Sequence, residues 1–223
     1  MFEDKYSFSQ DQNRRFAKMN LTRLVFTNSK FVGVNTTLPQ TQTIIDGVGV
    51  NGISIDDINM IVQLKRGWQY IINEDRPISM RVMKDINSIV VNLNPEEFKD
   101  GSTSIGKLMS SSIDEHAEEN YLQELLKDKN KSVTEKSIEI MYHLMKNKIF
   151  WNGNKRTATL VANKYMIDNG VELINIPLYC WDEWNKLISD YYYDNDMSKI
   201  KEWTYKVGIQ GIDIFKTNIK DKQ

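Results

Sequence analysis

NKIFWNGNKRTATLV, residues 147–161, is the stretch of sequence that decides the fold. It places Gly153 and Asn154 beside two basic residues, Lys155 and Arg156, where an apolar helical pattern begins. The first turn of a helix leaves about four N–H groups unpaired and carries roughly half a positive charge. Glycine lets the backbone approach a ligand closely, and the Asn and Arg side chains can bond an anion's oxygens. The stretch therefore predicts an anion site at a helix start. The alternative is an ordinary loop whose Asn caps a helix and whose cations are solvated.

Helical patterns lie on both sides of this stretch. A capping box opens the helix expected over 132–147, and Asn-Gly ends the one expected over 154–167. Further out, apolar residues recur at helical spacing, which predicts helices over 9–25, 41–45, 55–73, 78–93, 107–127, 181–193 and 198–207. One short extended piece is expected at 172–176.

The segment 96–105 differs from this helical pattern. It holds Asp100-Gly101 at its centre, a dipeptide typical of hairpin turns. Repeats, low-complexity tracts and linkers are not evident, and Trp151 is expected in the core. The sequence therefore predicts a single, mainly α domain over 1–223: a helical bundle with one small β-hairpin.

Composition excludes several classes of protein. The 223 residues include 29 basic and 30 acidic side chains, a net charge of −1, so general nucleic-acid binding is not expected. The lone Cys180 forms no internal disulfide, which favours a reducing, cytoplasmic setting. No apolar run approaches the ~20 residues of a membrane span, and the polar N-terminus is not typical of a signal peptide.

The central stretch resembles the signature of the Fic/Doc (Fido domain) family, H-x-F-x-(D/E)-G-N-x-R-x-x-R. The matching residues are Phe150, Gly153, Asn154 and Arg156, with Lys155 as in the N-K-R form of Doc-type members. The resemblance covers about 21–177, and the helices in 178–223 are expected to pack on that part. It implies a Fic-like helical bundle whose 96–105 hairpin is the family's flap.

This resemblance implies a transferase. Typical members move AMP from ATP onto a Ser, Thr or Tyr hydroxyl of a target protein, whereas Doc-type members phosphorylate. The loop amides hold the phosphates, the acidic residue binds Mg²⁺, and the histidine takes the hydroxyl proton. The flap holds a target segment by strand pairing, and here its central residues are Lys99, Asp100, Gly101, Ser102 and Thr103.

The first departure from the motif is its base, because Lys148 stands where the family has histidine. A general base needs a pKa near the working pH. Lysine has a pKa of about 10.4 and histidine about 6.5, so an ordinary lysine is protonated at neutral pH. Three interpretations of Lys148 stay open: a base with a lowered pKa, a phosphate-binding or structural cation, and a solvated lysine. His116 and His143 are not expected to substitute for the missing histidine.

Two further departures remove charge. Asn152 occupies the acidic position, so Mg²⁺ is expected to bind more weakly. Thr159 stands where many members have a second arginine, and Gly33, in the segment 29–35, stands where autoinhibited members have a glutamate. Since both partners of that ion pair are absent, glutamate-type autoinhibition is not expected.

These observations lead to two functional hypotheses. The first is a catalytically degenerate Fic-fold protein that still binds ATP or another nucleotide at Gly153, Asn154, Lys155 and Arg156, with Mg²⁺ held weakly. The second is a divergent active transferase, either AMP-transferring or Doc-like and phosphorylating. The expected partner is a target protein at the flap or a regulatory protein, with self-association left open and no membrane contact.

Overall fold

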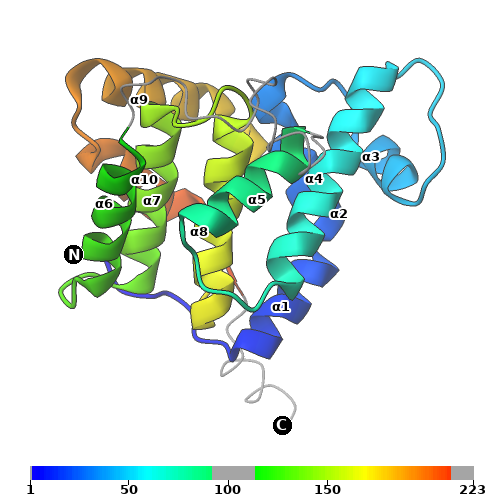
Figure 1. Ribbon diagram of the computed structural model, residues 1–223. Coiled ribbons are helices and arrows are strands. Elements are labelled where there is room, and N and C mark those ends of the chain that lie inside the picture. The colour runs from blue at the N-terminus through cyan, green and yellow to red at the C-terminus, as the bar shows by residue number, and fades with distance from the viewer. Residues whose placement is uncertain (1, 92–113, 212–223) are drawn as a thin grey trace, which may run out of the picture.

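The computed structural model describes residues 2–91 and 114–211, which form a mainly helical structure (Figure 1). The helices are α1 (Gln10–Met19), α2 (Leu21–Ser29), α3 (Leu38–Ile45), α4 (Ile55–Asn73), α5 (Met80–Val91), α6 (Glu115–Lys127), α7 (Val133–Asn147), α8 (Asn154–Asn169), α9 (Trp181–Asp194) and α10 (Ser198–Val207). Two short 3-10 helices are η1 (Lys30–Val32) and η3 (Leu178–Cys180), and two short strands are β1 (Leu173–Ile174) and β2 (Ile209–Gln210). The predicted mainly α fold is confirmed.

The two strands form a small antiparallel sheet. Leu173 pairs with Gln210 and Ile174 with Ile209, which joins the end of the described chain to the segment after α8. The sequence predicted the extended piece at 172–176 but not its partner strand. The predicted hairpin at 96–105 lies outside the described residues.

Helix α8 forms the centre of the bundle, between α7 and α5 in Figure 1. It also contacts α4 and α1, so it is buried around most of its circumference rather than on one face. Close packing requires small residues at the contacts. At Gly67 of α4, for example, a Cβ would lie 2.7 Å from Leu160 Cδ1.

Polar side chains are buried with α8 and are satisfied by specific partners. Asn163 is fully buried; its Nδ2 donates to Thr159 O (2.9 Å) and Ile174 O (3.0 Å), and its Oδ1 accepts from Ile174 N (2.9 Å). A single amide therefore satisfies both backbone groups of a strand residue that no water reaches. This attaches β1 to the central helix.

The prediction of one helix over 9–25 is wrong, because the chain breaks at Asn20. Asn20 leaves the helical region (φ −100°, ψ 6°), and its side-chain Nδ2 donates to Phe16 O (2.8 Å), which closes α1. Such local bonding competes with helix continuation. The other predicted helices agree in type, and the one expected over 107–127 is described from Glu115 onward.

Membrane crossing finds no support in the described ranges. None of their helices combines the length and the apolar character that a bilayer span requires.

Asn163→Ala tests the attachment of β1. The substitution leaves the N–H and C=O of Ile174 buried without partners, so we expect the free energy of unfolding to fall by about 2–4 kcal/mol. Urea denaturation of the purified chain measures this loss.

Asn73→Ala is the matched control. Asn73 is exposed, and its side chain makes one comparable bond, from Nδ2 to Gln69 O (2.7 Å). We expect its loss to cost about 0.5 kcal/mol or less. Equal effects of the two substitutions would show that Asn163 does not hold β1.

Candidate functional site

The candidate site begins in the sharp turn between α7 and α8. Lys148 ends α7 in the left-handed region (φ 48°, ψ 52°), and Gly153 opens α8 in the same region (φ 74°). A positive φ is uncommon for a non-glycine residue and marks Lys148 as a special position. The loop 148–153 thus reverses the chain and presents the first turn of α8.

Helix α5 fixes the shape of this loop. A Cβ on Gly153 would lie 2.7 Å from Val91 Cγ1 and 3.2 Å from Asn87 Nδ2, so glycine is required by contact as well as by φ. Asn87 Nδ2 donates to Asn152 O (2.8 Å) and to Thr157 Oγ1 (3.0 Å). One α5 side chain therefore holds both the loop and the first turn of α8.

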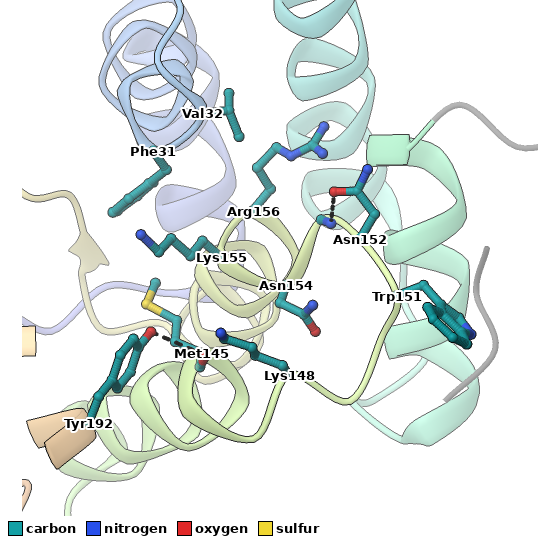
Figure 2. A pocket seen from close by; sticks show the side chains of 11 residues that line it. Phe31, Val32, Met145, Lys148, Trp151, Asn152, Asn154, Lys155, Arg156 and Tyr192 are labelled. Carbon is teal, nitrogen blue, oxygen red and sulfur yellow. Dashed lines mark hydrogen bonds between the residues drawn. The ribbon is translucent and has the colours of Figure 1, made fainter. Parts of the chain in front are cut away.

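Two loop asparagines bond the loop's own backbone. Asn154 accepts from Phe150 N at Oδ1 (2.9 Å) and donates to Phe150 O from Nδ2 (2.7 Å). Asn152 Oδ1 accepts from Gly153 N (2.6 Å; Figure 2). Asn154 was expected to bond an anion through its side chain, but here that amide shapes the loop, with Phe150 buried as its anchor.

A pocket of about 320 Å³ opens beside the loop. Its lining residues are Phe31, Val32, Met145, Lys148, Trp151, Asn152, Gly153, Asn154, Lys155, Arg156 and Tyr192. Three of them are cations and none carries a carboxylate. Figure 2 shows Lys148 and Lys155 reaching to one side of the loop, toward Phe31 and Tyr192. The pocket therefore combines a cationic wall with an apolar one. All five predicted binding and base residues line it: Lys148, Gly153, Asn154, Lys155 and Arg156.

Arg156 is 3 % exposed and supports the loop from within. Its Nη1 donates to Val90 O and contacts Met60 Sδ, toward α5 and α4. Within the described part of the chain it pairs with no carboxylate, and its Nε has no partner. Burial lowers the pKa of the guanidinium to about 10. A buried, uncompensated positive charge behind a helix N-terminus favours an anion nearby.

Lys148 and Lys155 differ in burial and in the groups around their ammonium ends. Lys155 is half-buried, with its Nζ 5.5 Å from the ring centroid of Trp184. Burial, followed by the charge of Lys148, lowers the pKa of the Lys155 ammonium. Lys148 is exposed, and among the described residues its side chain makes no hydrogen bond or ion pair. Its ammonium is therefore available to a ligand.

The segment 29–35, where autoinhibition is not expected because Gly33 replaces a glutamate, reaches the same pocket. Gly33 ends η1 with φ 77°, and the two residues before it, Phe31 and Val32, line the pocket. A Cβ at Gly33 would meet no heavy atom within 4 Å. Thr159 is not part of the lining; it is buried, and its Oγ1 donates to Lys155 O (2.9 Å).

Among the described residues, neither histidine lines the pocket, and the tyrosine that does is held by a hydrogen bond of its own. His143 stacks on Tyr121 (3.7 Å between centroids), and its Nε2 lies 2.8 Å from Glu118 Oε2, away from the pocket lining. His116 lies in the first turn of α6. Burial raises the pKa of Tyr192 to about 12, and its hydroxyl donates to Met145 O (3.2 Å).

Sequence reasoning missed part of the site. Trp151 is 49 % exposed rather than packed in the core, and Figure 2 shows it pointing away from Lys148 and Lys155. The apolar wall was also not foreseen, because Phe31 and Tyr192 come from distant parts of the chain. The predicted flap residues 99–103 lie outside the described ranges.

Asn154→Ala tests whether that side chain shapes the loop. The substitution removes both bonds to Phe150, so the Phe150 amide should exchange its hydrogen at least about tenfold faster, a loss of ~1.4 kcal/mol of protection. Hydrogen exchange read by NMR measures it, with Asn169→Ala, an exposed asparagine at the other end of α8, as control. Unchanged exchange would leave Asn154 free for a ligand.

Comparison with known proteins adds to this geometry. Residues 77–166 match the model of the Fic/DOC family, a region that contains α5, α7, the loop and most of α8. No curated protein has a sequence that matches significantly.

Solved Fic structures share the fold. Fic-1 from C. elegans superposes with a TM-score of 0.70 at 18% identity, over 87% of this chain and 61% of that one, so this chain spans less than two thirds of it. A Fic domain containing signaling protein from Bacteroides thetaiotaomicron superposes with a TM-score of 0.67 at 13% identity, over 87% and 80% of the two chains. Residues 77–166 are thus similar to the Fic/DOC family, and the chain shares the fold of solved Fic-domain structures.

Proposed function

We propose that this protein binds a nucleotide or a similar phosphate-bearing ligand at the loop 148–156, and that it lacks efficient transfer of AMP to a hydroxyl. The observation that carries the proposal is the pocket at the start of α8, whose lining has three cations and no carboxylate. Unpaired N–H groups of the first helical turn add to this charge. Such a pocket favours anions.

The two walls suggest how a nucleotide would lie. Its phosphates would face the α8 N-terminus, Lys148 and Lys155, where charge-assisted bonds are strongest. Its base or ribose would lie against Phe31, Met145 and Tyr192, which offer apolar surface in the same pocket. Ligand sites of this kind commonly combine apolar contact with a few polar groups.

The missing function is proton removal. Transfer to a hydroxyl requires a base that takes its proton. Lys148 stands at the position of the family base as an exposed side chain, and a lysine ammonium offers three donors and no acceptor. Burial raises the pKa of the Tyr192 hydroxyl, which lines the pocket, and both histidines lie away from the pocket lining. Binding without efficient transfer follows.

One observation favours the second candidate, an active transferase. Burial and the neighbouring Lys148 lower the pKa of Lys155, so a fraction of its amine is neutral at a pH below the usual range for lysine. A neutral amine in the pocket could take a proton. Transfer assays separate the two candidates.

We test transfer by incubating lysate with ATP labelled at the α-phosphate, without and with the purified chain. Wild type should add no labelled protein above the level seen with Lys148→Asn, which removes the amine and tolerates a left-handed backbone. The double substitution Lys148→His, Asn152→Asp restores the base and the metal-binding carboxylate of the motif and should raise labelling roughly 100-fold, the usual contribution of a base.

Labelling by wild type that disappears in Lys148→Asn would show that Lys148 is catalytic and would overturn this proposal. Labelling that disappears only in Lys155→Met would identify Lys155 as the base. The same assay with γ-labelled ATP detects phosphoryl transfer.

Phosphate binding should depend on pH through Lys155. Burial, followed by the charge of Lys148, lowers its pKa, so the ammonium that attracts phosphate is lost at a lower pH than that of an ordinary lysine. ADP affinity, measured by calorimetry, should therefore fall as pH rises, before the pH at which an ordinary lysine titrates. Lys155→Met should bind roughly tenfold more weakly at neutral pH and show a flatter profile.

Lys129→Met provides the control, since Lys129 is an exposed lysine in the turn before α7. Its affinity and pH profile should match those of wild type. A wild-type profile that is flat, or that Lys155→Met leaves unchanged, would remove Lys155 from the binding site.

A further inference from the structure

Members of this family use Mg²⁺, but the residues at its position do not fit a divalent cation. Asn152 occupies the acidic position, and its Oδ1 already accepts from Gly153 N at 2.6 Å. None of the pocket-lining residues carries a carboxylate. Across residues 2–91 and 114–211, no group of three or more His, Cys, Asp or Glu side chains could hold a metal. Mg²⁺ binds through carboxylates and phosphates, so the protein would supply almost nothing to it.

The positive charge of the site comes instead from side chains. Lys148 and Lys155 reach to the same side of the loop (Figure 2). Arg156 also lines the pocket but extends to another side, toward α4 and α5, and its buried Nε has no partner in the described chain. An arginine that is 3 % exposed and lacks a carboxylate is not a solvated surface charge. A negative charge nearby would stabilise this buried guanidinium, and the described residues do not provide one.

We infer that these side chains take the place of the metal, so that the pocket binds diphosphate-bearing anions in their free form and disfavours their Mg²⁺ complexes. This inference rests on the proposed function. Mg²⁺ cancels much of the charge of a diphosphate, which weakens its attraction to Lys148 and Lys155. The ion itself would also be repelled by the same amines, because like charges at close range raise the free energy.

The test is calorimetric titration of the full chain with ADP, once with EDTA and once with excess MgCl₂. Affinity should be at least severalfold higher with EDTA. Lys148→Asn should weaken binding in EDTA by roughly tenfold and reduce the effect of Mg²⁺. The control, Lys129→Asn, should behave as wild type, and thermal unfolding should show that both variants remain folded.

Each other outcome has a separate meaning. Binding that requires Mg²⁺, or is strengthened by it, would overturn this inference and leave the proposed nucleotide site intact. Absence of ADP binding in both buffers, at millimolar ligand, would overturn the proposed function itself.

Inorganic pyrophosphate in place of ADP tests the phosphate contacts alone. Equal affinity for pyrophosphate with and without Mg²⁺ would also contradict the exclusion of the metal complex.

Asn152→Asp provides the opposite perturbation. A carboxylate at this position adds a ligand for Mg²⁺ and repels free phosphate. ADP binding by this variant should be weakened in EDTA and should be restored by Mg²⁺. If the variant still prefers the metal-free ligand, the residue at position 152 does not decide how the pocket handles the metal.

Discussion

The contact of Gly153 with α5 is the constraint on which the site depends. No side chain fits there, since a Cβ would lie 2.7 Å from Val91 Cγ1, and the positive φ of Gly153 turns the chain into α8 at that point. Asn87 then bonds the loop and the first turn of α8. Because α8 is itself buried at the centre of the bundle, this contact sets where the helix N-terminus points. The pocket and its amines follow from that direction.

The charges around the loop indicate that it has a function beyond connecting α7 to α8. Unpaired charge in a protein interior costs stability, and proteins retain it most often where it has a function. Arg156 is such a charge, and two lysines share its pocket without any carboxylate in the lining. The loop amides, meanwhile, are held in place by Asn152 and Asn154. The described loop therefore combines a rigid backbone with unpaired positive charge, the combination that the proposed anion site requires.

Much of this could be predicted from local sequence. The order of glycine, asparagine and basic residues, with capping signals on both flanks, indicated the loop, the helices around it and the family. What could not be predicted depends on contacts across the chain. Phe31 and Tyr192 form a wall of the pocket only because η1 and α9 pack near the loop. Local patterns also misjudged one competition for hydrogen bonds, because Asn20 breaks a helix by bonding Phe16.

A crystal structure of the full chain with ADP, grown in EDTA and again with MgCl₂, tests the central claim most directly. We expect the diphosphate at the N-terminus of α8, within hydrogen-bond distance of Lys148 Nζ and Lys155 Nζ, with no metal between the phosphates and Asn152 in the first crystal. ADP bound away from this loop, or a Mg²⁺ ion held between its phosphates and Asn152 as a condition of binding, would contradict the claim.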